Sequence, residues 1–142
     1  MNQAKAYLSQ IKNLDYKIRR RQQEAKELRE AAMSFGSLQL DPDRVRSTSP
    51  DPDPMAGKVG GYVDIQKEVD AMIIELMELK HKIIGQIEQI KEVPYMDVLS
   101  MRYVDFMTFD AIAREMHCDI RHVFRLHGRA LQVFEEKFLK MS

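Results

Sequence analysis

Two long segments of the chain carry apolar residues at alternating spacings of three and four, and this pattern constrains the fold more than any other feature. In the first segment the series breaks once, at Arg21, and its members are Tyr7, Ile11, Leu14, Ile18, Ala25, Leu28 and Ala32. In the second segment the series includes one glutamine, and its members are Tyr62, Ile65, Val69, Met72, Leu76, Leu79, Ile83, Gln86 and Ile90. A mean period of 3.5 residues is typical of a coiled-coil seam.

The two heptad segments also differ in charge. Residues 2–33 carry 8 basic and 4 acidic side chains, whereas residues 62–92 carry 4 basic and 7 acidic ones. Each apolar seam needs a partner, and the opposite charges favour pairing of the two segments with each other. We therefore predict a long antiparallel coiled-coil hairpin, closed within one chain or exchanged between two chains. We also expect a homodimer through this hairpin.

The segment between the two series, residues 34–61, is rich in serine and proline. Three prolines alternate with aspartates at its centre, and they are Pro50, Pro52 and Pro54. Proline removes backbone donors and interrupts helices, and the segment offers little apolar surface to bury. We predict a mobile connector over residues 34–61.

A boundary is predicted at Pro94. Proline disfavours helix at the preceding Val93 and suits the first turn of a new helix. The sequence therefore predicts an all-α protein with two parts: a helical hairpin at residues 1–93 and a helix-turn-helix domain at residues 94–142.

The helix-turn-helix is predicted from two amphipathic helices, over residues 108–116 and from Ile120 to about residue 140. Thr108 and Asp119 each stand at the start of one helix, and both residue types are favoured N-caps. Three residues separate the helices. In this motif the second helix enters the major groove of DNA.

The second of these helices has two unlike faces. Its predicted buried stripe consists of Val123, Leu126, Ala130, Phe134 and Phe138. The outward face contains no acid and consists of Arg121, His122, Phe124, Arg125, His127 and Arg129. Arginine can bond the edge of guanine or pair with phosphate, and an apolar ring can meet a thymine methyl. A solvated basic face is the alternative, but caps, turn and stripe together favour double-stranded DNA as the partner.

The segments Leu99–Tyr103, Thr108–Ala113 and Asp119–Leu131 resemble region four of the sigma-70 family. The whole layout resembles small phage and prophage proteins of Gram-positive bacteria that are described as sigma-like or late-gene transcription regulators. The resemblance implies a phage-derived transcription regulator that binds DNA in a sequence-specific manner, with RNA polymerase as a second candidate partner.

The resemblance also assigns individual contacts. It implies base contacts by Ile120, Arg121 and Arg125, and contacts nearer the DNA backbone by His122, Phe124 and Arg129. Ile120 and Arg121 replace the basic-then-acidic pair usual in housekeeping sigma factors, so we expect a different target sequence. His117 stands where the turn usually has glycine, so we expect a left-handed backbone there at some energetic cost.

The sequence gives little support for a metal site or for catalysis. His117, Cys118, His122 and His127 are close in the chain, but structural zinc usually takes four ligands in paired short spacings. We expect no metal, no cofactor and no catalytic residue, and hence no enzyme. The single cysteine, the lack of a signal peptide and the lack of a long apolar run lead us to expect a cytoplasmic protein away from membranes.

Two alternatives from other classes stay open. The coiled coil itself could be the functional part, in an adaptor or structural protein whose C-terminal helices only pack. The protein could also be a phage DNA-packaging recognition subunit, which combines the same elements but usually carries its DNA-binding part first.

Overall fold

The computed structural model describes residues 3–38 and 54–140, with side chains for residues 3–34 and 60–140. These ranges contain helices and no strand, which confirms the all-α fold class. The elements are α1 (Gln3–Leu8), α2 (Gln10–Leu38), α4 (Pro54–Glu88), α5 (Val93–Leu99), the π-helical turn η1 (Ser100–Val104), α6 (Phe109–Glu115), α7 (Ile120–Phe134) and the π-helical turn η2 (Glu135–Leu139). Among the described helices, none combines the length and apolar character needed to cross a bilayer.

The chain divides into two compact units. The hairpin unit is Tyr16–Ile74 and holds most of α2 and the first part of α4. The head unit combines Met1–Asp15 with Glu75–Ser142, so the first helix groups with the C-terminal helices. The domain boundary predicted at residues 93–94 stays a prediction.

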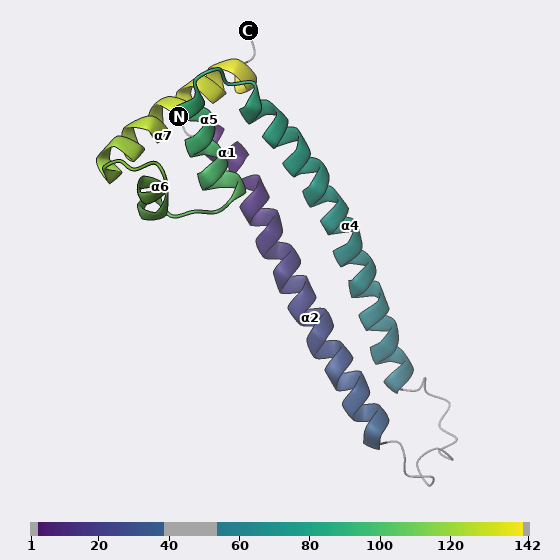
Figure 1. The fold of residues 1–142 in the computed structure, drawn as a ribbon. Helices are drawn as coiled ribbons and strands as arrows, with labels where there is room; N and C mark the ends of the chain where they lie inside the picture. The colour runs from purple at the N-terminus through teal and green to yellow at the C-terminus, as the bar shows by residue number, and fades with distance from the viewer. Residues whose placement is uncertain (1–2, 39–53, 141–142) are drawn as a thin grey trace. The chain divides into compact units, whose positions relative to one another are not determined.

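In the hairpin unit, α2 and α4 lie side by side and run in opposite directions (Figure 1). Its buried seam consists of Ile18, Ala25 and Ala32 from α2 and Val69 from α4. The side chain of Leu28 packs against the backbone of α4 at Gly61, where an added Cβ would lie 3.1 Å from Cδ2 of Leu28. The predicted antiparallel hairpin is confirmed.

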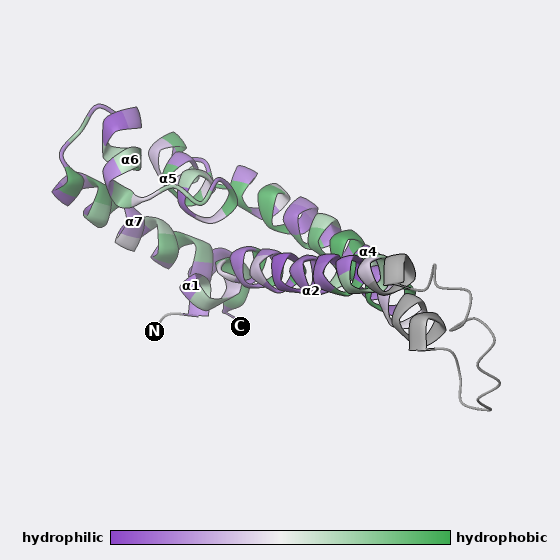
Figure 2. Ribbon diagram, turned by 90° about the horizontal axis from the view of Figure 1, so that it is seen from below, coloured by the Kyte–Doolittle hydropathy of each residue, from purple (hydrophilic) through white to green (hydrophobic). Residues whose placement is uncertain are grey.

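The burial along both helices follows the heptad repeat. Every seventh position from residue 11 to residue 32 and from residue 69 to residue 90 is at most 9% exposed. These positions are Ile11, Ile18, Ala25 and Ala32 in the first series and Val69, Leu76, Ile83 and Ile90 in the second. Figure 2 shows that α4 carries more hydrophobic residues than α2, which is mostly hydrophilic. A narrow seam with polar flanks is what a period of 3.5 residues predicts.

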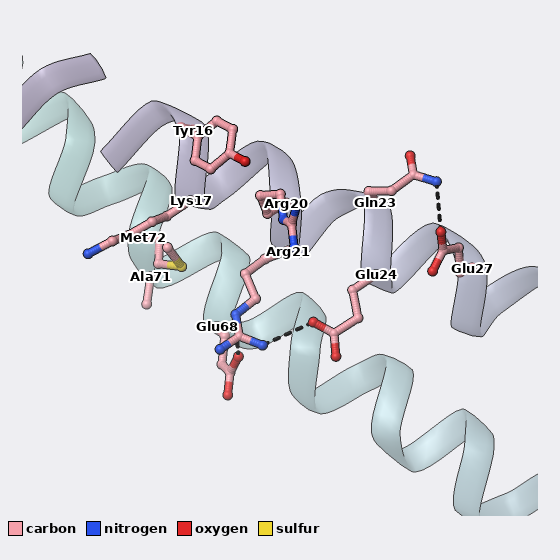
Figure 3. A pocket seen from close by; sticks show the side chains of 10 residues that line it. All are labelled: Tyr16, Lys17, Arg20, Arg21, Gln23, Glu24, Glu27, Glu68, Ala71 and Met72. Carbon is pink, nitrogen blue, oxygen red and sulfur yellow. Dashed lines mark hydrogen bonds and ion pairs between the residues drawn. The ribbon is translucent and has the colours of Figure 1, made fainter. Parts of the chain in front are cut away.

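Arg21, which interrupts the first apolar series, pairs with acids instead. Its Nη1 lies 3.0 Å from Oε2 of Glu24 on the same helix. Its Nε lies 3.8 Å from Oε2 of Glu68 on α4, so the cation reaches across to the acidic helix (Figure 3). All three side chains are about half exposed, and such pairs contribute roughly 1 kcal/mol or less. At the break, a weak ion pair between α2 and α4 therefore stands where the repeat would place an apolar contact.

The connector is shorter than predicted. We predicted it over residues 34–61, but α2 continues to Leu38 and α4 already begins at Pro54. Proline is compatible with the first turn of a helix because the N–H that it lacks has no helical partner there. The remaining part of the predicted connector, residues 39–53, lies outside the described residues.

The head unit has its own apolar core, to which α1, the start of α2, the end of α4, α5, α6 and α7 contribute. Its largest fully buried side chains are Leu8, Ile11, Ile83, Ile87, Val98, Leu99, Ile112, Val123 and Phe134. Tyr7 joins the N-terminal helix to the rest, because its hydroxyl donates to Oε1 of Gln86 at 2.7 Å and its ring lies 5.7 Å from that of Phe134. The buried side of α7 packs on this core.

Candidate nucleic-acid interface

The two helices of the helix-turn-helix begin at the predicted caps. Oγ1 of Thr108 accepts from the backbone N–H of Ala111 at 3.1 Å, at the start of α6. Oδ1 of Asp119 accepts from the N–H of Arg121 at 3.4 Å, at the start of α7. Each cap satisfies a backbone donor that the first helical turn leaves free. Both capping predictions are confirmed.

The turn between α6 and α7 is closed by a Schellman motif. The N–H of Cys118 donates to the carbonyl of Ala113 at 3.0 Å, and the N–H of His117 donates to that of Arg114 at 3.2 Å. His117 has a φ of 54°, so the left-handed conformation predicted for this position is confirmed. Glycine is the usual residue here, and a side chain with a Cβ pays a conformational cost.

The exposed face of α7 is basic, as the sequence predicts. Arg121, His122, Arg125 and Arg129 are exposed, and Ile120 is half-buried at the start of the helix. The three arginines recur every four residues, which places them in one row along the helix. The whole of α7 contains no acidic residue. Gly128 leaves this face open, since an added Cβ would meet nothing within 4 Å.

Phe124 lies at the edge of the basic face rather than in its centre. Its side chain is 50% exposed, and its ring meets that of Phe109 edge to face at a centroid distance of 5.0 Å. The contact links α7 to the first residue of α6. Half of the ring stays available to a partner.

The sequence predicts His127 on the outward face of α7, and this prediction is wrong. It is half-buried, and its Nε2 is hydrogen-bonded to the hydroxyl of Tyr103 at 2.7 Å. Burial, with smaller contributions from the charges of Arg102 and Lys5, lowers the pKa of His127 to about 4. The reason lies in the helical period: position 127 is four residues after Val123, which belongs to the buried stripe.

Tyr103 is the buried partner of that histidine. Its side chain is 6% exposed, and burial raises the pKa of its hydroxyl to about 12. Both groups are therefore neutral at physiological pH, which suits a hydrogen bond between a buried phenol and a half-buried ring. The pair fixes η1 against α7.

Arg102 has a structural role that the sequence analysis did not assign. Its guanidinium carbon lies 4.2 Å from the ring centroid of Phe109, and its Nη1 donates to the carbonyl of Met107 at 2.9 Å. The same loop contains Phe106 at a φ of 58°. An arginine followed by a tyrosine just before a capped helix is the only sequence signal for this arrangement, and it is a weak one.

The three histidines and the cysteine at residues 117–127 do not converge on one point. His117 and His122 are exposed, whereas His127 turns inward to Tyr103. Within residues 3–38 and 54–140, no three His, Cys, Asp or Glu side chains are grouped as a metal site would require.

Comparison with known proteins gives a family and no function. No curated protein and no solved structure matches the chain. A family described as "Protein of unknown function (DUF1492)" matches residues 60–135, which is more than half of the chain. The match runs from α4 through α7, and so includes the capped helix-turn-helix and its basic face. The chain therefore belongs to the DUF1492 family.

Proposed function

We propose that the protein is a sequence-specific DNA-binding transcription regulator that lays α7 in the major groove. The observation that carries this proposal is the acid-free exposed face of α7, on which Arg121, Arg125 and Arg129 stand in one row. The chain has 22 basic and 22 acidic residues, so this face is a local concentration of charge and not a property of the whole.

The spacing of the arginines suits the DNA repeat. Side chains four residues apart on a helix are separated by about 6 Å, which is roughly two base-pair steps of about 3.4 Å. Arg121 and Arg125 stand in the first half of α7, where recognition helices contact bases. Arg129 stands further along and suits a phosphate.

The helix is also held rigidly, which base recognition requires. Its N-terminus is capped by Asp119, its buried stripe packs on the head-unit core, and Phe124 rests on α6. The likeness to region four of the sigma-70 family supports the same placement. It also supports a phage origin and a contact with RNA polymerase as parts of the proposal, with dimerisation through the hairpin.

An adaptor role has one observation in its favour. The hairpin unit exposes large apolar side chains, namely Tyr16 at 60%, Val63 at 42% and Ile74 at 58%. Such residues suit contact with another helix or protein. This second candidate does not need DNA.

Selection of bound duplexes from a random pool tests the leading proposal. We expect the wild-type protein to enrich a defined sequence and the Arg121→Ala/Arg125→Ala variant to enrich none. The matched control is Arg20→Ala/Arg29→Ala, which removes the same charge from exposed positions of α2 and should enrich the wild-type sequence. Failure of the wild type to enrich any sequence would favour the adaptor, and ring-shaped oligomers in solution would favour the DNA-packaging subunit.

A further inference from the structure

The head unit contains a second group of cations, away from the exposed face of α7. They line a pocket of about 170 Å³ that is walled by the N-terminal helices on one side and by η1, α6 and α7 on the other. Lys5, Ser9 and Lys12 face it from α1, α2 and the residue that joins them. Their spacings of four and three place them on one helical face. Arg102 and His127 complete the wall.

The lining has three positive charges and no carboxylate. The first acidic residue of the sequence is Asp15, so nothing in the preceding segment can neutralise the two lysines. Within the part of the chain that the structure describes, neither Lys5 nor Lys12 forms an ion pair. Cations gathered around one pocket repel one another, and an anion between them removes that repulsion.

Arg102 is held in a position where it can contact an anion in the pocket. Its stacking on Phe109 and its bond to the carbonyl of Met107 fix the guanidinium at the pocket wall. These contacts use one of the five N–H donors of the group, so others stay free for a ligand. Ser9 and Asn13 add neutral donors at the same wall.

We propose that this pocket binds a phosphate group, held by Lys5, Lys12 and Arg102 with hydrogen bonds from Ser9 and Asn13. The volume equals roughly five or six water molecules, which accommodates a tetrahedral phosphate and a little of what it is attached to. The group has two possible sources, a free phosphate or phosphate ester and a backbone phosphate of bound DNA. The proposal does not rest on DNA binding by α7.

His127 provides a reporter inside the pocket. The charges of Arg102 and Lys5 contribute to holding its ring neutral, and Tyr103 and Phe109 are its other neighbours. A phosphate dianion in the pocket offsets those cations and favours the charged ring. Binding therefore raises the pKa of His127 from about 4.

The test titrates the full chain with inorganic phosphate at constant ionic strength and follows the His127 ring by NMR. We expect saturable binding, a rise in the His127 pKa and a rise in Tm. Lys5→Gln/Lys12→Gln should weaken binding by roughly tenfold or more, because it removes two charge-assisted contacts. The control Lys26→Gln/Lys82→Gln removes the same charge from exposed positions outside the pocket and should bind like the wild type.

The two sources give different results. Binding of inorganic phosphate that depends on the two lysines supports a free ligand. No binding of inorganic phosphate, with a DNA salt slope smaller by about two in Lys5→Gln/Lys12→Gln, supports a backbone phosphate. The Arg121→Ala/Arg125→Ala variant should lose its sequence preference and still bind inorganic phosphate, which separates this site from α7. If the two lysines affect neither phosphate nor DNA, the pocket is not a phosphate site.

Discussion

At the scale of single residues, His127 shows how one turn of a helix separates two environments. Arg125 and Arg129 flank it in sequence and are exposed, whereas His127 turns toward Tyr103 and is held neutral. The ring and the phenol satisfy each other inside the head unit. This histidine therefore affects folding stability and not the charge of the exposed basic face of α7.

The lowered pKa of His127 makes stability depend on pH. In the unfolded chain the ring titrates at about 6.5, and in the folded chain at about 4. The unfolded state binds the proton more readily between these values, so the stabilisation is complete above about pH 6.5 and is lost as pH falls toward 4. Because solvent screens part of the ring, we expect a loss of about 1–2 kcal/mol. Denaturant unfolding at pH 4 to 7 measures it.

Two variants assign that pH dependence. His127→Leu should flatten the slope, since the titrating group is gone. His122→Gln removes an exposed histidine from the same helix and should leave the slope unchanged. An unchanged slope in His127→Leu would refute the assignment to His127.

His117 offers a gain in stability instead. Its φ of 54° is accessible to glycine without the steric cost that a Cβ brings. We expect His117→Gly to stabilise the protein by about 0.5–1 kcal/mol, whereas His117→Ala keeps the Cβ and should give no gain. Thermal unfolding of the two variants decides the point, and equal Tm values would mean that the turn is not strained.

At the scale of elements, the hairpin depends on a narrow seam in which one position of each heptad is buried. Val69 is 1% exposed, and Ile74 on the same helix is 58% exposed. The two positions therefore separate the effect of a charge in the seam from that of a charge on the surface.

We expect Val69→Asp to cost about 3–5 kcal/mol, because it buries an unpaired carboxylate. Ile74→Asp should cost less than about 1 kcal/mol, because its carboxylate stays in water. Circular dichroism during urea unfolding gives both values. Similar losses in the two variants would argue against the observed seam.

The sequence predicted those elements whose signal is periodic or local. The heptads predicted the hairpin, and Thr108 and Asp119 predicted where α6 and α7 begin. The left-handed turn at His117 was likewise predicted from its position. Helix ends near proline were predicted less well, because Pro54 starts α4 where a connector was expected.

Features that depend on tertiary packing could not be predicted in the same way. The pattern placed His127 outward because a polar residue was assigned to the polar face, although its position adjoins the buried stripe. The stacking of Arg102 on Phe109 joins residues that neither periodicity nor capping relates. The pocket that contains Lys5 depends on the N-terminal helix joining the head unit, which the heptad pattern does not reveal.

At the scale of the whole molecule, the formal net charge is zero, but basic and acidic side chains prevail in different segments. The row of arginines on α7 should contain two kinds of contact. We expect Arg129→Ala to weaken binding to all DNA sequences alike and to reduce the salt slope by about one, as the loss of a phosphate contact does. Titrations at several salt concentrations measure this slope, and an altered sequence preference in Arg129→Ala would show that it contacts a base instead.

The most direct test of DNA recognition by α7 is the affinity of the Arg121→Ala/Arg125→Ala variant for the duplex that the wild type selects. Fluorescence anisotropy on the selected and a scrambled duplex, at one salt concentration, gives the four affinities. Each base contact contributes about 1–3 kcal/mol, so we expect the variant to bind the selected duplex roughly 30-fold or more weakly and to lose its preference over the scrambled one. Equal binding of the selected duplex by both proteins would contradict the placement of α7 in the major groove.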